Sequence, residues 1–351
     1  MHELFDLTAA DGTRLTAWRN RAEEGPRVLV CNGMGVPPQA WPRLIDDDCR
    51  YQVASWNQRG VLGSDIPADP TRIQIGDHVE DAVALLDHLG WDEAVVVGWS
   101  LGVNVAFELV RAHPARVSGI LSVAGVPGGT FDTVLATLPL PRGLRRPLGK
   151  GIVQAGRLVA PQLNALTRML GERHALAEVV RFSGMVLPTA RAADVRPWAE
   201  AMFSQEWAPY FELALALERH DRVDPSFVEV PVTVVAGELD ALTAHDDVKA
   251  FASQIPHAEF LSLRGSHCLP LEFPEGMVSL VDALVARIEA DRAGRDYLRR
   301  FESVPAVIDE AASPEILSAT ERAWFGDRPR SPRSPRSERP WWASDPEPAT
   351  A

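Results

Sequence analysis

The feature that most constrains this chain is the run Gly98-Trp99-Ser100-Leu101-Gly102, which stands between an apolar β-branched segment, residues 94–97, and a helix-period segment, residues 101–112. A strand that turns directly into a helix forces the central residue into a strained backbone conformation, so the flanking positions must be glycine to avoid clashes. The serine oxygen is then exposed above the sheet. We therefore predict a strand–helix elbow with Ser100 as a nucleophile, and a purely structural serine is the alternative.

Short apolar runs alternate with helix-period segments over the first 125 residues and again after residue 231. This alternation indicates βαβ units, so we predict an α/β fold in which helices cover both faces of a mostly parallel, twisted sheet. A turn signal at Ala10-Asp11-Gly12 predicts an N-terminal hairpin. The predicted strands are 3–9, 13–18, 28–31, 51–56, 94–97, 117–124, 232–236 and 259–263, and the predicted helices are 75–86, 101–112, 246–254 and 276–290.

The alternation stops between about residues 131 and 225, where the sequence shows only helical segments that are punctuated by prolines and rich in large apolar residues. A helical insertion between two strands of a parallel sheet is typical of a cap over the active edge, and a helical layer that only completes the core is the alternative. The expected regions are a core of 1–130 and 226–292, a helical cap of 131–225, a helical C-terminal extension of 293–325 and a disordered Arg/Ser/Pro-rich tail of 326–351.

The composition of the chain limits the possible partners and the cellular compartment. The net charge of −13 disfavours a nucleic-acid partner, because phosphate binding needs a concentrated positive face. No apolar run approaches the length of a membrane span, and the first residues do not resemble a secretory signal. The three cysteines are an odd number without metal-type spacing, which suits a reducing cytoplasm. We expect a cytoplasmic protein that acts on a small molecule without a metal or an organic cofactor.

A serine nucleophile needs a base, and the base needs an orienting carboxylate. Of the nine histidines, His267 follows the predicted strand 259–263 and precedes the last predicted helix, which places it at the sheet edge expected for Ser100. Asp240 follows the predicted strand 232–236 at the same edge. Glu238 competes for the role of the acid, but Asp240 lies deeper in its loop. The predicted triad is therefore Ser100, Asp240 and His267.

At this point the chain resembles the α/β-hydrolase superfamily, and in particular capped serine hydrolases related to esterases, haloperoxidase-like hydrolases and C–C bond hydrolases. The resemblance covers residues 1 to about 290 and keeps the family's order of nucleophile, acid and histidine. Relatives with aspartate at the elbow are dehalogenases or epoxide hydrolases, and Ser100 weighs against both. Besides the elbow, the resemblance rests on Gly237-Glu238-Leu239-Asp240, on Gly265-Ser266-His267 followed by Glu272 and Pro274, and on Gln58-Arg59-Gly60-Val61-Leu62-Gly63-Ser64, with Leu62 where the family usually has glycine.

Two backbone N–H groups are candidates for an oxyanion hole. The Leu101 N–H opens the helix after Ser100, where the helix dipole favours a negative charge. The resemblance implies the Met34 N–H as the second donor, because Asn32-Gly33-Met34-Gly35 resembles the family's His-Gly-x-Pro turn. Asparagine replaces histidine and glycine replaces proline, so we expect Gly35 to loosen the loop. A plain glycine turn is the alternative.

The resulting prediction is a serine hydrolase that cleaves a carboxylic ester of a small, apolar substrate through an acyl-enzyme on Ser100. Trp99 and the cap aromatics Phe203 and Trp207 are candidates for substrate binding, although such residues as often serve packing. A C–C bond hydrolase, an acyltransferase or a cofactor-free perhydrolase could use the same triad. A non-catalytic binding protein of the same fold is the alternative from another class, and the oligomeric state is left open.

Overall fold

The computed structural model describes residues 2–135, 141–171, 180 and 186–302 of the 351-residue chain. Its centre is an eight-stranded sheet in the order β1-β2-β4-β3-β5-β6-β7-β8. The first two strands form the predicted antiparallel hairpin and join β4 antiparallel, whereas the other five neighbouring pairs are parallel. The predicted α/β class is therefore confirmed. The strands are β1 (Glu3–Thr8), β2 (Arg14–Arg19), β3 (Arg27–Cys31), β4 (Gln52–Trp56), β5 (Ala94–Trp99), β6 (Val117–Val123), β7 (Val232–Gly237) and β8 (Glu259–Leu263).

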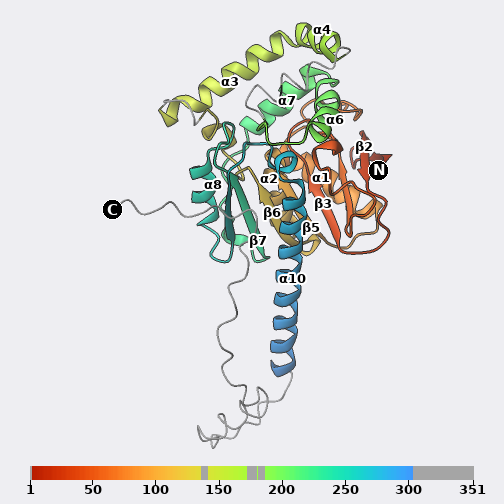
Figure 1. The fold of residues 1–351 in the computed structure, drawn as a ribbon, viewed down its shortest axis with the longest axis vertical. Helices are drawn as coiled ribbons and strands as arrows, with labels where there is room; N and C mark the ends of the chain where they lie inside the picture. Colours follow the sequence, from red (N-terminus) through yellow and green to blue (C-terminus); the bar gives the residue numbers. More distant parts are fainter. Residues whose placement is uncertain (1, 136–140, 172–179, 181–185, 303–351) are drawn as a thin grey trace, which may run out of the picture. The chain divides into compact units, whose positions relative to one another are not determined.

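Helices cover both faces of this sheet (Figure 1). On one face, α1 (Ile75–His88), α2 (Leu101–Ala112) and α8 (His245–Ala252) share a single hydrophobic cluster with alternate strand residues such as Val96. On the other face, Ile288 near the middle of α10 (Pro274–Glu302) lies over Gly119, and its neighbour Arg287 donates a hydrogen bond to the Val232 carbonyl at 3.1 Å. All six residues of β5 are buried, as its continuous apolar run predicts for a strand covered on both faces.

The segment between β6 and β7 is a helical insertion, and its described residues contain no strand. Its helices contact one another beyond one end of the sheet, and α6 also contacts the short helix η1 (Pro38–Ala40), which follows β3 (Figure 1). This arrangement agrees with a cap over the carboxyl ends of the parallel strands. Within the described residues, the helices of the insertion with complete bounds are α3 (Arg142–Leu158), α4 (Ala160–Gly171), α6 (Ala192–Phe203) and α7 (Trp207–Glu218).

The chain divides into two compact units, residues 1–288 and 289–351. In the second unit, the described residues 289–302 continue the helix of α10. The rest of the C-terminal extension expected over 293–325, from residue 303 on, and the tail expected over 326–351 lie outside the described residues. One short helix was not predicted, α9 (Leu269–Glu272), which directly follows His267. No helix within the described ranges has both the length and the apolar character needed to cross a membrane.

Candidate active site

Ser100 occupies the predicted elbow between β5 and α2, with the strained backbone angles φ 56° and ψ −115°. A Cβ on Gly98 would lie 2.8 Å from the Gly102 carbonyl oxygen, and a Cβ on Gly102 would lie 1.7 Å from the Cys31 carbonyl oxygen. Real Cβ atoms do not approach backbone so closely, so both glycines are required by the turn. Because neither glycine has a side chain, α2 can start directly behind the strand, and Ser100 stays partly exposed.

His267 and Asp240 meet in the loops that follow β8 and β7. The His267 Nδ1 lies 2.8 Å from the Asp240 Oδ2, and both residues are buried. The other carboxylate oxygen of Asp240 accepts hydrogen bonds from the N–H groups of Leu242 and Thr243, each at 2.8 Å. These bonds fix the carboxylate, and the carboxylate in turn fixes the orientation of the imidazole.

Glu238, the competing acid, is turned away from this pair. It is exposed, and its Oε1 accepts a hydrogen bond from the Ser262 hydroxyl at 3.0 Å. The loop therefore presents the carboxylate of Asp240, and not that of Glu238, to the imidazole.

The elbow and the histidine loop are joined through Trp99. Its indole N–H donates to the His267 carbonyl oxygen at 2.9 Å, and its ring lies 6.0 Å from the imidazole, centre to centre. Within the described residues no hydrogen bond links the Ser100 hydroxyl to the His267 imidazole. In enzymes without substrate such bonds are often long and tighten only in the reacting complex.

Glu272 anchors the histidine loop from the far side. Its carboxylate accepts hydrogen bonds from the N–H of Ser266 at 2.8 Å and from the Ser266 hydroxyl at 2.5 Å. The other neighbour, Cys268, is 4% exposed, and this burial raises the pKa of its thiol well above the ordinary value. The thiol next to His267 therefore stays protonated, which makes it a poor nucleophile.

The loop Asn32–Gly35 follows β3 and faces the elbow, and it is held by a side chain that the sequence analysis did not single out. The Gln58 amide donates to the carbonyl oxygens of Asn32 and Gly33, at 3.1 and 3.0 Å, and its oxygen accepts the Gly35 N–H at 3.1 Å. Three buried hydrogen bonds thus fix the backbone on both sides of Met34. The available signal was the position of Gln58, directly before Arg59-Gly60 in a run already recognised.

Gly35 does not loosen this loop as expected. Its φ is +61°, a value that proline cannot adopt, and the Gln205 amide donates to its carbonyl oxygen at 3.2 Å. A Cβ at this position would lie 2.6 Å from Gln205 and 2.8 Å from the ring of Tyr210. Glycine is therefore what allows the insertion to pack against the loop. The N–H groups of Met34 and Leu101 have no acceptor among the residues that the structure describes.

The three candidate substrate-binding residues lie in two places. Trp99 is 2% exposed and packs edge-on against Trp41 beneath the elbow, with 5.9 Å between ring centres. Phe203 and Trp207 belong to an aromatic cluster of α6 and α7, 5.7 Å apart between ring centres, and the Trp207 indole points to the Thr167 hydroxyl. No described contact joins either cap aromatic to Ser100 or His267, so their role in substrate binding stays a prediction.

Tyr210 of the insertion reaches the Asn32–Gly35 loop, although no sequence motif marks it. It packs with Met34 and Leu62 against a small buried cluster, and its ring crowds the Cα of Gly35. Burial raises the pKa of its hydroxyl to about 12. The phenol is thus neutral at any physiological pH.

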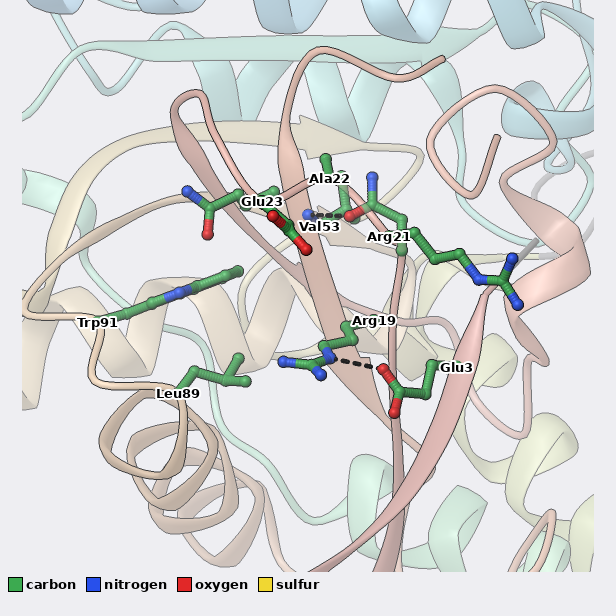
Figure 2. A pocket seen from close by; sticks show the side chains of 10 residues that line it. Glu3, Arg19, Arg21, Ala22, Glu23, Val53, Leu89 and Trp91 are labelled. Atoms are coloured by element: carbon green, nitrogen blue, oxygen red, sulfur yellow. Dashed lines mark hydrogen bonds and ion pairs between the residues drawn. The ribbon is translucent and has the colours of Figure 1, made fainter. Parts of the chain in front are cut away.

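A separate cavity of about 450 Å³ has no part in this arrangement (Figure 2). It is lined by Gln52 at the start of β4 and Arg19 at the end of the antiparallel β2, so it lies at the amino ends of the parallel strands. Arg19 forms an ion pair with Glu3 there, at 2.9 Å. Ser100, Asp240 and His267 all follow the carboxyl ends of their strands, at the opposite edge of the sheet.

Comparison with known proteins shows which family this chain matches. A family model described as "alpha/beta hydrolase fold" matches residues 26–274, which is more than half of the chain. The esterase from Exiguobacterium antarcticum has a solved structure that superposes with a TM-score of 0.61 and 17% identity, covering 81% of this chain and 98% of that one. At this identity the superposition supports the fold alone.

Two sequence relatives differ in how much of them the chain covers. Epoxide hydrolase B of Mycobacterium tuberculosis is 27% identical over 144 residues, which are 37% of this chain and only 40% of that protein. The pimeloyl-[acyl-carrier protein] methyl ester esterase of Aromatoleum aromaticum is 25% identical over 270 residues, which are 74% of this chain and 98% of that protein. The similarity to the esterase therefore extends along the whole relative, whereas that to the epoxide hydrolase covers less than half of it.

Proposed function

This chain belongs to the alpha/beta hydrolase fold family, and from that premise we propose that it is a serine hydrolase that cleaves a carboxylic ester through an acyl-enzyme on Ser100. The observation that carries the proposal is the buried pair of His267 and Asp240, 2.8 Å apart, beside an elbow serine with a positive φ. An acid, a base and an exposed hydroxyl on three neighbouring loops are the parts that nucleophilic acyl transfer needs.

In the first half of the reaction, the His267 Nε2 takes the proton of the Ser100 hydroxyl while the Ser100 oxygen attacks the ester carbonyl carbon. Asp240 holds the Nδ1–H of the imidazole, which leaves Nε2 free to accept this proton and stabilises the imidazolium that forms. The proton then passes from Nε2 to the leaving alcohol oxygen as its bond to carbon breaks. The products are the free alcohol and an ester of Ser100.

In the second half, water replaces the alcohol. His267 removes a proton from the water molecule as its oxygen attacks the acyl carbon, and the bond between that carbon and the Ser100 oxygen breaks. The proton returns to Ser100, and the carboxylic acid leaves. The chain's own residues thus suffice for both proton transfers.

The N–H groups of Met34 and Leu101 hold the oxyanion in both halves. Gln58 and Gln205 fix the loop that carries Met34, while the elbow fixes Leu101. Donors that are held in place before the charge forms need no reorganisation, and losing one costs about 2.7–4 kcal/mol of the barrier.

Two further points favour an ester over an epoxide. Relatives that open epoxides use an aspartate at the elbow, whereas this chain has Ser100. One relative that matches over almost its whole length is named as a methyl ester esterase. The cap aromatics Phe203 and Trp207 favour a small, apolar acyl or alcohol group, and we propose residues 131–225 as the boundaries of this cap.

Labelling with a fluorophosphonate probe tests the proposal, since such probes modify only an activated serine. We expect the full-length protein to be labelled, and we expect Ser100→Ala to remain unlabelled. Ser253→Ala is the matched control, because Ser253 is an exposed serine that bonds only to its own helix. An unlabelled wild-type protein, or labelling that persists in Ser100→Ala, would contradict the proposed nucleophile.

A further inference from the structure

Exposed apolar side chains gather on two helices of the insertion, α3 and α4. Among the residues that the structure describes, eleven large hydrophobic side chains are exposed, and seven of them lie between residues 144 and 169. Monomeric proteins rarely expose such a concentration of apolar surface without a use for it. We call these seven the outer cap surface: Leu144, Leu148, Ile152, Leu158, Val159, Leu166 and Met169.

The orientation of α3 is the reverse of that of an ordinary surface helix. Leu144, Leu148 and Ile152 recur every four residues and so share one side of the helix, where they are 44–54% exposed. Arg146 and Lys150 lie on the other side and reach the buried carboxylate of Glu218, at 2.8 and 3.0 Å. The charged side of the helix therefore faces the protein, and the apolar side faces outward.

The charge of this segment differs from that of the rest of the chain. Residues 142–171 contain six basic residues and no acidic residue, although the whole chain has a net charge of −13. Within the described residues these six side chains form ion pairs with four carboxylates, which leaves two more basic than acidic groups in these pairs: Asp247, Glu218, Glu212 and Glu206. At the two ends of the surface, the side chains of Arg142 and Arg168 are 75% and 70% exposed.

From this pattern we infer that the outer cap surface docks onto an anionic lipid surface. The aliphatic side chains would enter the boundary between headgroups and acyl chains, and the flanking arginines would extend to the headgroup phosphates. A second copy of the chain fits less well, because pairing two such surfaces would bring two basic rims together. The docking is separate from the proposed ester hydrolysis and does not depend on it.

The test is co-sedimentation of the full-length protein with vesicles, in the absence of any ester. We expect binding to vesicles made of equal parts phosphatidylglycerol and phosphatidylcholine, and much weaker binding to phosphatidylcholine alone. Each basic side chain that reaches the anionic surface should contribute about fivefold, and added salt should weaken the binding. The variant Leu148→Ser/Ile152→Ser should lower the partition coefficient about a hundredfold, about tenfold for each side chain.

A matched control separates docking from a general loss of apolar surface. Leu4→Ser/Ile66→Ser removes two side chains that are 58% and 65% exposed but lie outside the outer cap surface, and its binding should equal that of the wild type. Circular dichroism checks that both double variants are folded. Equal binding of both vesicle types would overturn the inference, as would unchanged binding by Leu148→Ser/Ile152→Ser. A dimer in sedimentation velocity that dissociates in this variant would assign the surface to a second copy and overturn it as well.

Discussion

At the carboxyl edge of the sheet, a Cβ on Gly102 would lie 1.7 Å from a backbone oxygen, and the Asp240 carboxylate is held by two backbone N–H groups. In the helical insertion, by contrast, the helices are held to one another by side chains, such as the exposed ion pair of Arg157 and Glu212. Exposed ion pairs contribute little to stability, and their members can be exchanged. The proposed chemistry therefore depends on closely packed backbone positions, whereas the proposed specificity depends on side chains that can be exchanged.

The largest loss of activity should come from a substitution of Ser100, at the carboxyl edge of the sheet. We expect Ser100→Ala to reduce hydrolysis of short p-nitrophenyl esters by about a factor of 10⁶, as removal of the nucleophile does in other triads. The melting temperature should change little, because Ser100 is only partly buried and its hydroxyl forms no hydrogen bond within the described residues. Retained turnover in a folded variant would remove Ser100 from the mechanism.

The next largest effect should separate Asp240 from Glu238, the two acids on one loop. Asp240→Asn should lower kcat by about 10⁴, because an amide favours the wrong tautomer of His267 and does not stabilise the imidazolium. Glu238→Gln should leave kcat close to the wild-type value, since Glu238 bonds only to the Ser262 hydroxyl in this structure. Steady-state kinetics of the two variants checks the assignment, and the reverse order of effects would make Glu238 the acid.

The same contrast explains which features of the fold and of the site can be predicted from the sequence. The elbow glycines, the strands themselves and the loop that contains His267 follow from short-range patterns, because backbone sterics and burial allow few residues there. Asp240 was separable from Glu238 only by its depth in the loop. Gln58 and Tyr210 were missed because their partners, the loop at Gly35 and the packed insertion, are distant in sequence. The outward apolar side of α3 was also not foreseen, since an amphipathic pattern does not tell which side faces the protein.

A third experiment tests Gln58, a positioning residue at the carboxyl edge of the sheet. It asks whether substitution there lowers kcat, as expected for the sheet edge, or changes only the substrate preference, as expected for the insertion. Gln58→Leu removes three hydrogen bonds of the loop that carries Met34, so we expect kcat to fall about 10- to 100-fold with little change in KM. The buried groups left unpaired should also lower the free energy of unfolding by about 1–3 kcal/mol.

Gln254→Leu provides the control for this substitution, since Gln254 is exposed and, among the described residues, its side chain donates only to the Ala250 carbonyl of the preceding helix α8. Gln58→Glu should also lower kcat, because its carboxylate still accepts the Gly35 N–H but sets a second acceptor against the carbonyl oxygens of Asn32 and Gly33. An equal loss of stability with unchanged kcat would make Gln58 a purely structural residue.

The smallest effect should come from the insertion, where substitutions are expected to change preference rather than rate. If the aromatic cluster of the cap lines the acyl site, kcat/KM should rise about three- to fourfold for each added carbon, since a buried methylene contributes about 0.8 kcal/mol. It should fall once the site is full. Phe203→Ala enlarges the site and should move the optimum to longer acyl chains. Phe5→Ala is the control, because Phe5 is half-buried and stacks on His88 of α1, outside the insertion. A flat response from acetate to decanoate would mean that these aromatics only hold the cap together, and polar contacts would then have to select the substrate.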